Sequence, residues 1–312
     1  MGTGLAGHRV SDPVRRGPAQ TARMGVPSGL EPYARTIDLP RSRTRLFYYE
    51  AGAADSPPML LVHGLGDEAD TWRRVIGPLS RSFRVIAPDL PGFGRSSLPR
   101  RRLSPPFLAG VMRELVDRLG IRSATWVGSS LGAGVAQVAA LKWPAAVARL
   151  VLLDGEVRAR PRLRGALFGM LVPGAGERRY SDLRDDPEAA YASLRPYYGN
   201  LDALPADERE FLRVRVNDRV WSDTQRTAYF SAFRSLIVWT IVAGRRTARL
   251  AASLDAKTFH IWGADDLIVP LQSWNAADAR VSIIPGVGHL PHQESPDEVV
   301  RLIEEACSAR GT

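Results

Sequence analysis

Short, unbroken apolar runs constrain the fold of this 312-residue chain more than any other feature of its sequence. Each run is four or five residues long and lacks the alternation of apolar and polar residues that marks a strand with one wet face. Continuous runs of this kind are typical of strands buried on both faces of a parallel sheet. They span residues 59–62, 83–87, 124–127, 150–153, 258–262 and 281–284.

Helical patterns separate these runs. Residues 107–119 repeat apolar side chains every three to four positions, residues 131–143 form a stretch rich in Ala and Gly, and a last helix is predicted over residues 296–307. Two strand-like segments, residues 35–39 and 44–49, precede the first run. The alternation of strands and helices predicts an α/β fold with a doubly wound, mostly parallel sheet.

The segment 155–250 differs from the rest of the chain. Strand-like runs are absent from it, and helical stretches with scattered aromatic residues and arginines take their place. We therefore predict that residues 31–154 and 251–312 form one core and that residues 155–250 form a helical cap inserted into it. Residues 1–30 are rich in Gly, Pro, Arg and Ser and predict a disordered leader.

The net charge of +9 comes almost entirely from arginine, since the chain has 40 Arg and 2 Lys. No nucleic-acid-binding motif and no basic stripe interleaved with aromatic residues accompanies this charge, so no nucleic-acid partner is predicted. Arginines at residues 158–164 adjoin an apolar stretch at residues 165–172. This arrangement is that of a solvated arm beside an ordinary lid helix, or of a segment in weak contact with an anionic membrane surface.

Targeting and redox features are few. No apolar run approaches the roughly 20 residues of a membrane-spanning helix, and no signal peptide is recognisable, so we expect a cytoplasmic protein. The single cysteine, Cys307, excludes an internal disulfide and a cysteine-based metal site. The sequence implies neither a metal nor an organic cofactor.

The pentapeptide Gly128–Gly132 is a G-x-S-x-G sequence between a predicted strand and a predicted helix. A tight turn at this place projects the hydroxyl of Ser130 above the sheet and requires residues without side chains beside it. The N-terminus of the following helix directs its dipole toward a negative charge that forms there. Ser130 is therefore the candidate nucleophile.

A serine hydroxyl needs a base near neutral pH, and the base needs an acid to orient it. His289 is the candidate base, because it lies in a glycine-bearing loop directly after the last predicted strand. His292 is the alternative, although it lies on the polar approach to the final helix. His260 lies within a predicted strand and is interpreted as a core residue.

The acid is expected to follow the strand before that histidine. Asp265 and Asp266 both stand in this turn, and Asp154, just after the run at residues 150–153, is a third candidate. The structural interpretation of Asp265 and Asp154 is turn or cap formation.

Attack on a carbonyl group creates an oxyanion that needs preorganised donors. The turn after the run at residues 59–62 offers the N–H of Leu65, and the N–H of Leu131 directly follows the nucleophile. We predict that these two donors form the oxyanion hole. His63 is interpreted as a hydrogen-bonding residue that fixes its own loop.

The order of these motifs makes the chain resemble the α/β-hydrolase superfamily, in particular its lid-bearing esterases, lipases and C–C hydrolases. The resemblance covers residues 35–154 and 251–309. The acid of that family lies three residues after the glycine of its turn, which implies Asp266, and its oxyanion donors correspond to Leu65 and Leu131. The motifs are His63-Gly64-Leu65-Gly66 with Trp72, Asp89–Ser96, Gly128–Gly132, Gly263–Asp266 with Pro270, and Gly288-His289.

The resemblance implies a serine hydrolase that cleaves a carboxylic ester or related acyl bond of a small apolar molecule through an acyl-enzyme. Alternatives with the same triad are a C–C hydrolase, a lyase, a thioesterase and an acyltransferase, and a binding protein on an inactive scaffold is a further one. Haloalkane dehalogenases and epoxide hydrolases of this fold use an aspartate nucleophile, so Ser130 excludes them.

Overall fold

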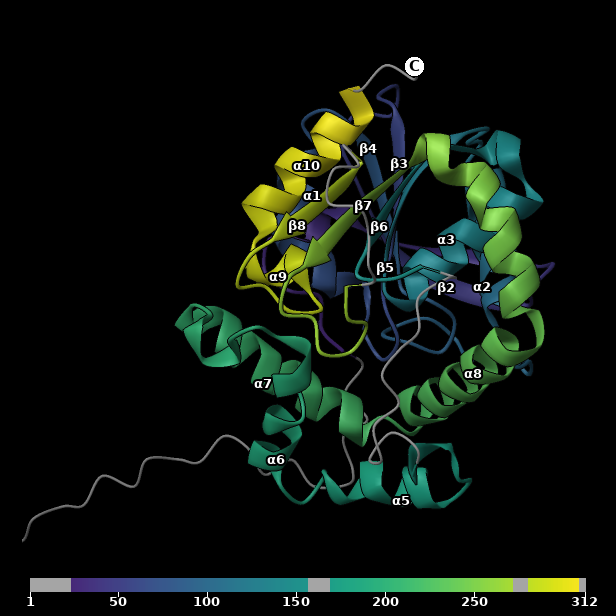
Figure 1. Ribbon diagram of the computed structural model, residues 1–312. Coiled ribbons are helices and arrows are strands. Elements are labelled where there is room, and N and C mark those ends of the chain that lie inside the picture. The colour runs from purple at the N-terminus through teal and green to yellow at the C-terminus, as the bar shows by residue number, and fades with distance from the viewer. Residues whose placement is uncertain (1–23, 157–168, 272–279, 309–312) are drawn as a thin grey trace, which may run out of the picture.

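The computed structural model describes residues 24–156, 169–271 and 280–308 (Figure 1). The predicted leader lies outside the described residues up to residue 23, and so does the basic segment 158–164. The predicted end of the leader at residue 30 is corrected by the structure. Met24 and Leu30 are buried, and Leu30 packs into the core beside the sheet. Arg215 also donates to the carbonyl oxygen of Gly25, which holds this segment against the body of the protein.

In the part of the chain that the structure describes, one sheet of eight strands forms the centre. The strands are β1 (Ala34–Leu39), β2 (Thr44–Ala51), β3 (Pro58–Val62), β4 (Arg84–Pro88), β5 (Ala124–Ser129), β6 (Val147–Leu153), β7 (Thr258–Gly263) and β8 (Val281–Ile284). Their order is β1-β2-β4-β3-β5-β6-β7-β8. Only the pairs β1–β2 and β2–β4 are antiparallel, so the predicted mostly parallel, doubly wound sheet is confirmed.

Helices cover both faces of the sheet. They are α2 (Pro105–Arg118) and α3 (Leu131–Lys142) on one face, and α1 (Arg73–Leu79) and α10 (Pro296–Ser308) on the other.

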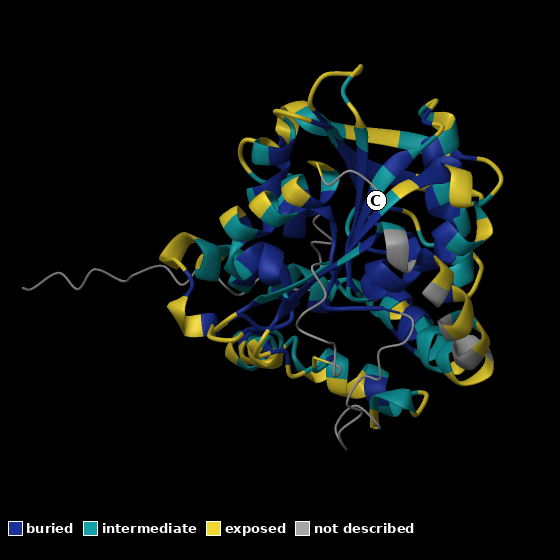
Figure 2. Cartoon of the chain, turned by 45° about the horizontal axis from the view of Figure 1, so that its top comes forward, coloured by how far each residue is buried: buried dark blue, intermediate teal, exposed yellow. Residues whose placement is uncertain are grey.

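Strand β3 shows why its apolar run is unbroken. Leu60 and Val62 point into the core shared with α2 and α3, whereas Met59 and Leu61 point into the core shared with α1 and α10. All four side chains are fully buried. Figure 2 shows the strands as the buried centre, with exposed residues on the outer sides of the helices and in the loops.

The helical insertion (residues 155–250) leaves the sheet after β6 and returns to it at β7. Its main helices are α5 (Ala175–Asp182), α6 (Pro187–Ala192), α7 (Ala206–Trp221) and α8 (Asp223–Ala251). The first three lie together beyond one end of the sheet, and α8 runs from there along α2 and α3 (Figure 1). Among the described residues, no helix is both long and apolar enough to cross a membrane.

Candidate active site

Ser130 lies at the junction of β5 and α3. Its backbone has φ 53° and ψ −115°, a conformation that few residues with a side chain adopt. The N–H of Ser130 donates to the carbonyl oxygen of Leu153 at 2.9 Å, which ties the turn to the neighbouring strand β6. Strain of about 1–3 kcal/mol persists only where the surroundings fix the backbone. The strained turn predicted for Ser130 is therefore present.

Close approach explains the two glycines of this turn. A Cβ atom at Gly128 would overlap the carbonyl group of Gly132, and one at Gly132 would overlap the carbonyl oxygen of Val62. Neither glycine has a positive φ. The backbones of β3, β5 and α3 therefore meet at distances that only glycine permits.

His289 links the serine to an acid. Its Nε2 lies 2.9 Å from Ser130 Oγ, and its Nδ1 lies 2.8 Å from Asp266 Oδ2. A carboxylate only accepts hydrogen bonds, so the ring proton is on Nδ1 and the lone pair of Nε2 faces the serine hydroxyl. This is the arrangement that a general base requires.

The structure separates the three candidate acids. Asp266 receives the hydrogen bond from His289, and its Oδ1 accepts the N–H groups of Ile268 at 2.7 Å and Val269 at 2.9 Å. Asp265 is exposed. Asp154 is fully buried behind the pair, where its Oδ1 accepts the N–H of Gly263 at 2.8 Å. The hydrogen bond of the base therefore goes to Asp266, the residue that the resemblance implied.

Asp154 is a buried neighbour of that carboxylate. Burial raises the pKa of Asp154 well above its ordinary value, and the charge of Asp266 raises it further. The polar atoms of Asp154, Asp266 and His289 lie within 4.8 Å of one another, a spacing that resembles a metal site. The ring nitrogens of His289 already bond Asp266 and Ser130, so His289 has no ring nitrogen left for a metal ion.

His63 and His260 take the structural places predicted for them, whereas His292, the alternative base, bonds a threonine rather than Ser130. His63 is buried, and its Nε2 accepts the N–H of Leu90 at 2.8 Å, so the proton is on Nδ1 and is donated to the carbonyl oxygen of Gly64 at 2.8 Å. His260 is buried in β7. His292, in the short helix α9 (Pro291–Glu294), bonds the hydroxyl of Thr71 at 2.7 Å.

A cavity of about 950 Å³ opens over Ser130 between the core and the helical insertion. Leu65 and Leu131, the predicted oxyanion donors, line it together with Ser130 and His289. Within the described residues, neither the N–H of Leu65 nor that of Leu131 has a hydrogen-bond acceptor. Most of the wall is apolar and comes from the insertion; its larger side chains are Tyr180, Tyr197, Tyr229, Phe233, Ile237 and Trp239.

The insertion also holds the histidine loop, which the sequence did not predict. The N–H of His289 donates to the carbonyl oxygen of Tyr197 at 2.8 Å. The carboxylate of Glu294 accepts the N–H of Gly288 and that of Gly199, each at 2.8 Å. Gly199 and Glu294 are 95 residues apart, and no local pattern pairs residues at that separation. The only signal in the sequence is the glycine at both contact points.

Comparison with known proteins gives a consistent result. The profile of the family described as the alpha/beta hydrolase family matches residues 59–302. An uncharacterised protein of Mycobacterium tuberculosis is 30% identical over 264 residues, which cover 81% of this chain and 75% of that protein. A 2-hydroxymuconate semialdehyde hydrolase of a Pseudomonas species is 31% identical over 295 residues, which cover 90% of this chain and 95% of that enzyme.

Solved structures show the same fold at lower identity. The 2-hydroxy-6-oxo-6-phenylhexa-2,4-dienoate hydrolase of Rhodococcus sp. strain RHA1 matches 88% of this chain and 100% of its own, with a TM-score of 0.69 and 21% identity. A bacterial membrane phospholipase A matches 88% of this chain and 87% of its own, with a TM-score of 0.68 and 24% identity. At these identities the likeness concerns the fold alone.

Proposed function

Because this chain belongs to the alpha/beta hydrolase family, we propose that it is a serine hydrolase that cleaves carboxylic esters with a bulky apolar group. The observation that carries the proposal is the unbroken series of hydrogen bonds from Asp266 through His289 to Ser130. This series ends on the floor of a mostly apolar cavity. In this function the helical insertion is a cap that covers the substrate.

The first half of the reaction forms an acyl-enzyme. Ser130 Oγ attacks the carbonyl carbon, and its proton passes to His289 Nε2 while Asp266 stabilises the imidazolium. The negative charge moves to the carbonyl oxygen, where the N–H groups of Leu65 and Leu131 accommodate it. The C–O bond then breaks, and the leaving alkoxide takes the proton from His289 Nε2.

The second half releases the acid. A water molecule gives a proton to His289 Nε2 and attacks the acyl carbon, and a second oxyanion forms at the same donors. When this intermediate collapses, the bond to Ser130 Oγ breaks and Oγ regains the proton.

The cavity supports a substrate of considerable size. Pockets for drug-sized ligands have volumes of about 300–1,000 Å³, and this cavity of about 950 Å³ lies at the upper end of that range. Of the charged side chains on its wall, Arg219 and Asp67 are paired with each other and Arg195 is paired with Asp202; the others are Glu156 and Arg179. We therefore propose an uncharged, aromatic or branched ester rather than a small polar one.

Carbon–carbon bond hydrolysis is the second candidate. Two relatives are named for it, the 2-hydroxymuconate semialdehyde hydrolase and a 2-hydroxy-6-oxo-6-phenylhexa-2,4-dienoate hydrolase of Comamonas testosteroni that is 29% identical over 277 residues. A dienoate carries a carboxylate, and Arg179, an exposed residue on the cavity wall, offers it a cation. The leaving group is then a carbon atom that takes its proton from His289.

Replacement of Ser130 tests the proposal. We expect Ser130→Ala to lose nearly all turnover of p-nitrophenyl esters of graded acyl length and all labelling by a fluorophosphonate probe, with an unchanged melting temperature. Undiminished turnover in this variant would contradict the assigned nucleophile.

The two candidate reactions are separated by their substrates. The wild-type enzyme is given an uncharged aryl ester and a 6-oxo-dienoate in parallel, and kcat/KM is measured for each. We expect the ester to be preferred. A strong preference for the dienoate, lost in Arg179→Gln, would favour C–C hydrolysis instead.

A further inference from the structure

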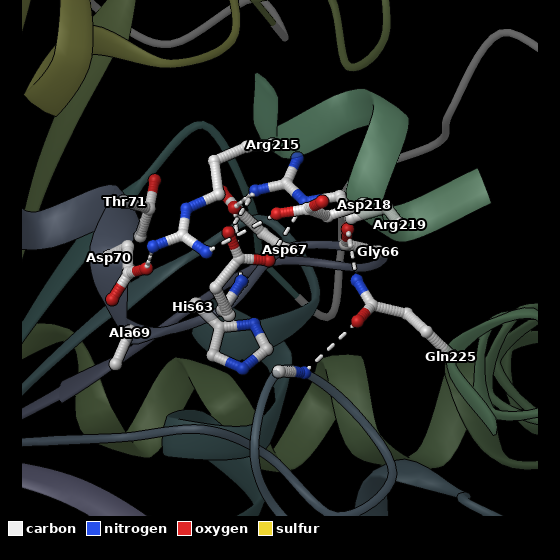
Figure 3. Close-up of polar contacts among 12 residues, drawn as sticks. His63, Gly66, Asp67, Ala69, Asp70, Thr71, Arg215, Asp218, Arg219 and Gln225 are labelled. Carbon is white, nitrogen blue, oxygen red and sulfur yellow. Dashed lines mark hydrogen bonds and ion pairs between the residues drawn. The ribbon is translucent and has the colours of Figure 1, made fainter. Parts of the chain in front are cut away.

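The turn that carries the Leu65 amide is held from outside by the helical insertion (Figure 3). We call residues 64–68 the oxyanion turn. Arg219 of α7 donates to Glu68 through two nitrogens, Nε to Oε2 at 2.8 Å and Nη2 to Oε1 at 2.7 Å. The same Nη2 also pairs with Asp67. One guanidinium group therefore binds two consecutive side chains of the turn.

The oxyanion turn has little stiffness of its own. Leu65 stands between Gly64 and Gly66, and Gly66 has a φ of 78°, which glycine adopts readily. Two other residues of the insertion lie against Gly66: Gln225 Nε2 donates to its carbonyl oxygen at 3.4 Å, and the ring of Tyr229 lies 3.0 Å from the place where a Cβ atom on Gly66 would stand. The direction of the Leu65 N–H thus depends on contacts from α7 and α8.

Burial makes the arginine contact indispensable to the two acids. Glu68 is fully buried and Asp67 is 8% exposed, so water cannot stabilise their charges. Two carboxylates this close repel each other unless a cation lies between them. Burial by itself lowers the pKa of Arg219, but the charges of Glu68 and Asp67 outweigh it and raise that pKa above its ordinary value.

Arg215, one turn earlier on α7, offers a natural comparison. It binds Asp70 at 2.6 Å and the carbonyl oxygen of Gly25 at 2.5 Å, both outside the oxyanion turn. Asp70 has further partners, Tyr49 Oη at 2.5 Å and Arg95 Nη2 at 2.8 Å. Arg215 is thus a buried, ion-paired arginine of the same helix with no contact to the Leu65 segment.

We propose that Arg219 is a positioning residue that fixes the oxyanion turn, so that the Leu65 N–H points at the developing negative charge. This inference rests on the serine hydrolase function proposed above. Without the guanidinium group, the turn is free to move while the relay of Ser130, His289 and Asp266 stays intact. The loss is then confined to stabilisation of the oxyanion, and substrate binding in the apolar cavity is preserved.

The test compares Arg219→Gln and Arg219→Lys with Arg215→Gln and Arg215→Lys in the full chain. Three quantities are measured for each variant: the melting temperature, kcat and KM for a p-nitrophenyl ester, and the second-order rate constant for labelling by a fluorophosphonate probe. The probe needs the nucleophile and the oxyanion donors but no knowledge of the natural substrate.

We expect Arg219→Gln to lower kcat and the labelling rate constant together, by about 10- to 100-fold, with KM near the wild-type value. Arg219→Lys keeps the positive charge but lacks the planar guanidinium group, so its kcat and labelling rate constant should lie between those of Arg219→Gln and the wild type. Arg215→Gln should lower the melting temperature comparably and change kcat by less than about threefold.

Three outcomes would overturn the proposal. They are a labelling rate constant for Arg219→Gln within about threefold of wild type, equal kinetic losses in Arg215→Gln, and a rise in KM with unchanged kcat, which would indicate direct contact with substrate. If Arg219→Gln does not fold, Arg219→Lys and Glu68→Gln carry the same comparison. Labelling that persists in Ser130→Ala would instead contradict the serine hydrolase function itself, whatever the arginine variants show.

Discussion

Asp154 and Asp266 show at the scale of single residues how two adjacent buried carboxyl groups take different roles. Asp266 accepts three N–H donors, from His289, Ile268 and Val269. Asp154 accepts the single N–H of Gly263, and within the described residues its Oδ2 has no hydrogen-bond partner. Hydrogen bonds to a carboxylate favour its charged form, whereas burial without them favours the neutral form.

The first prediction concerns the orienting acid. Asp266→Asn presents an amide N–H₂ to His289 Nδ1, which forces the ring proton onto Nε2 and leaves no lone pair for the serine. We expect kcat for a p-nitrophenyl ester to fall about 10⁴-fold with little loss of thermal stability. Asp265→Asn is the matched control, because its exposed side chain makes no contact with the relay. Equal losses in both variants would contradict the assignment.

The second prediction concerns Asp154 and pH. Its raised pKa means that the native state retains a proton that the unfolded chain releases near pH 4, so its contribution to stability is present at low pH and is lost as the pH rises toward the native pKa. Asp154→Asn cannot ionise and avoids this loss.

We therefore expect the unfolding free energy of Asp154→Asn, relative to wild type, to increase between pH 4 and pH 8. Urea unfolding at several pH values measures it, and titrating groups that do not interact with Asp154 cancel in the difference. A constant difference across this range would show that Asp154 is charged in the native protein.

For single residues, the sequence predicted which side chains lie at the site better than it predicted their pKa shifts. Ser130 was predicted from the G-x-S-x-G sequence and His289 from its loop after the last predicted strand, whereas Asp266 was implied by the resemblance to the family. That the pKa of Asp154 is raised could not be predicted, because the shift depends on burial and on the neighbouring Asp266, and both arise only when β6 and β7 pair.

At the scale of elements, the turn between β5 and α3 is the most demanding feature of the fold. The residues on either side of it could be predicted, since the apolar run at 124–127 and the Ala- and Gly-rich stretch at 131–143 became β5 and α3. The close approach of α3 to the end of β3 could not, because it joins Gly132 to Val62. The G-x-S-x-G motif predicts a glycine at residue 132, but it does not predict that this glycine lies against the backbone of Val62.

The third prediction follows from that approach. Gly132→Ala places a methyl group on the carbonyl oxygen of Val62, and backbone cannot yield there, so we expect a loss of about 3 kcal/mol or more in unfolding free energy. Gly134→Ala is the control in the same helix. Its Cβ has nothing within 4 Å, and we expect a gain of about 0.5–1 kcal/mol. Chemical denaturation measures both, and equal effects would contradict the packing argument.

At the scale of the whole molecule, the helical insertion and the core form one catalytic unit. The insertion supplies most of the cavity wall, contacts the histidine loop through Tyr197 and Gly199, and binds the oxyanion turn through Arg219. The existence of the insertion and its helical character could be predicted, because residues 155–250 lack strand-like runs and contain helical stretches. Its contacts could not, because each joins residues that lie far apart in the chain.

The stability of the whole fold at acidic pH depends on the buried residue His292. Burial lowers the pKa of His292 to about 3, and the charge of Arg73 lowers it further. In the unfolded chain this histidine titrates near pH 6.5, so the native state binds fewer protons between about pH 6.5 and 3. The stability that His292 contributes is thus complete above pH 6.5 and is lost as the pH falls.

The fourth prediction gives this effect a size. The variant His292→Phe keeps a ring against Trp72 but cannot take up a proton. Below pH 6.5 we expect the unfolding free energy of the wild type to fall by about 1.4 kcal/mol more per pH unit than that of the variant. Urea unfolding at pH 7.5, 6.5, 5.5 and 4.5 measures the slope. Parallel curves for wild type and variant below pH 6.5 would mean that another group controls acid unfolding.

The attachment of the insertion between two neighbouring strands has a consequence for engineering and for evolution. Strands β6 and β7 lie side by side, so a foreign cassette could be spliced at this site without disturbing the sheet. Such a chimera would acquire a new pocket shape, yet it would arrive without partners for His289 and Glu68. Recombination that transfers specificity among these hydrolases must therefore carry the docking residues along with the pocket, or accept a slower enzyme.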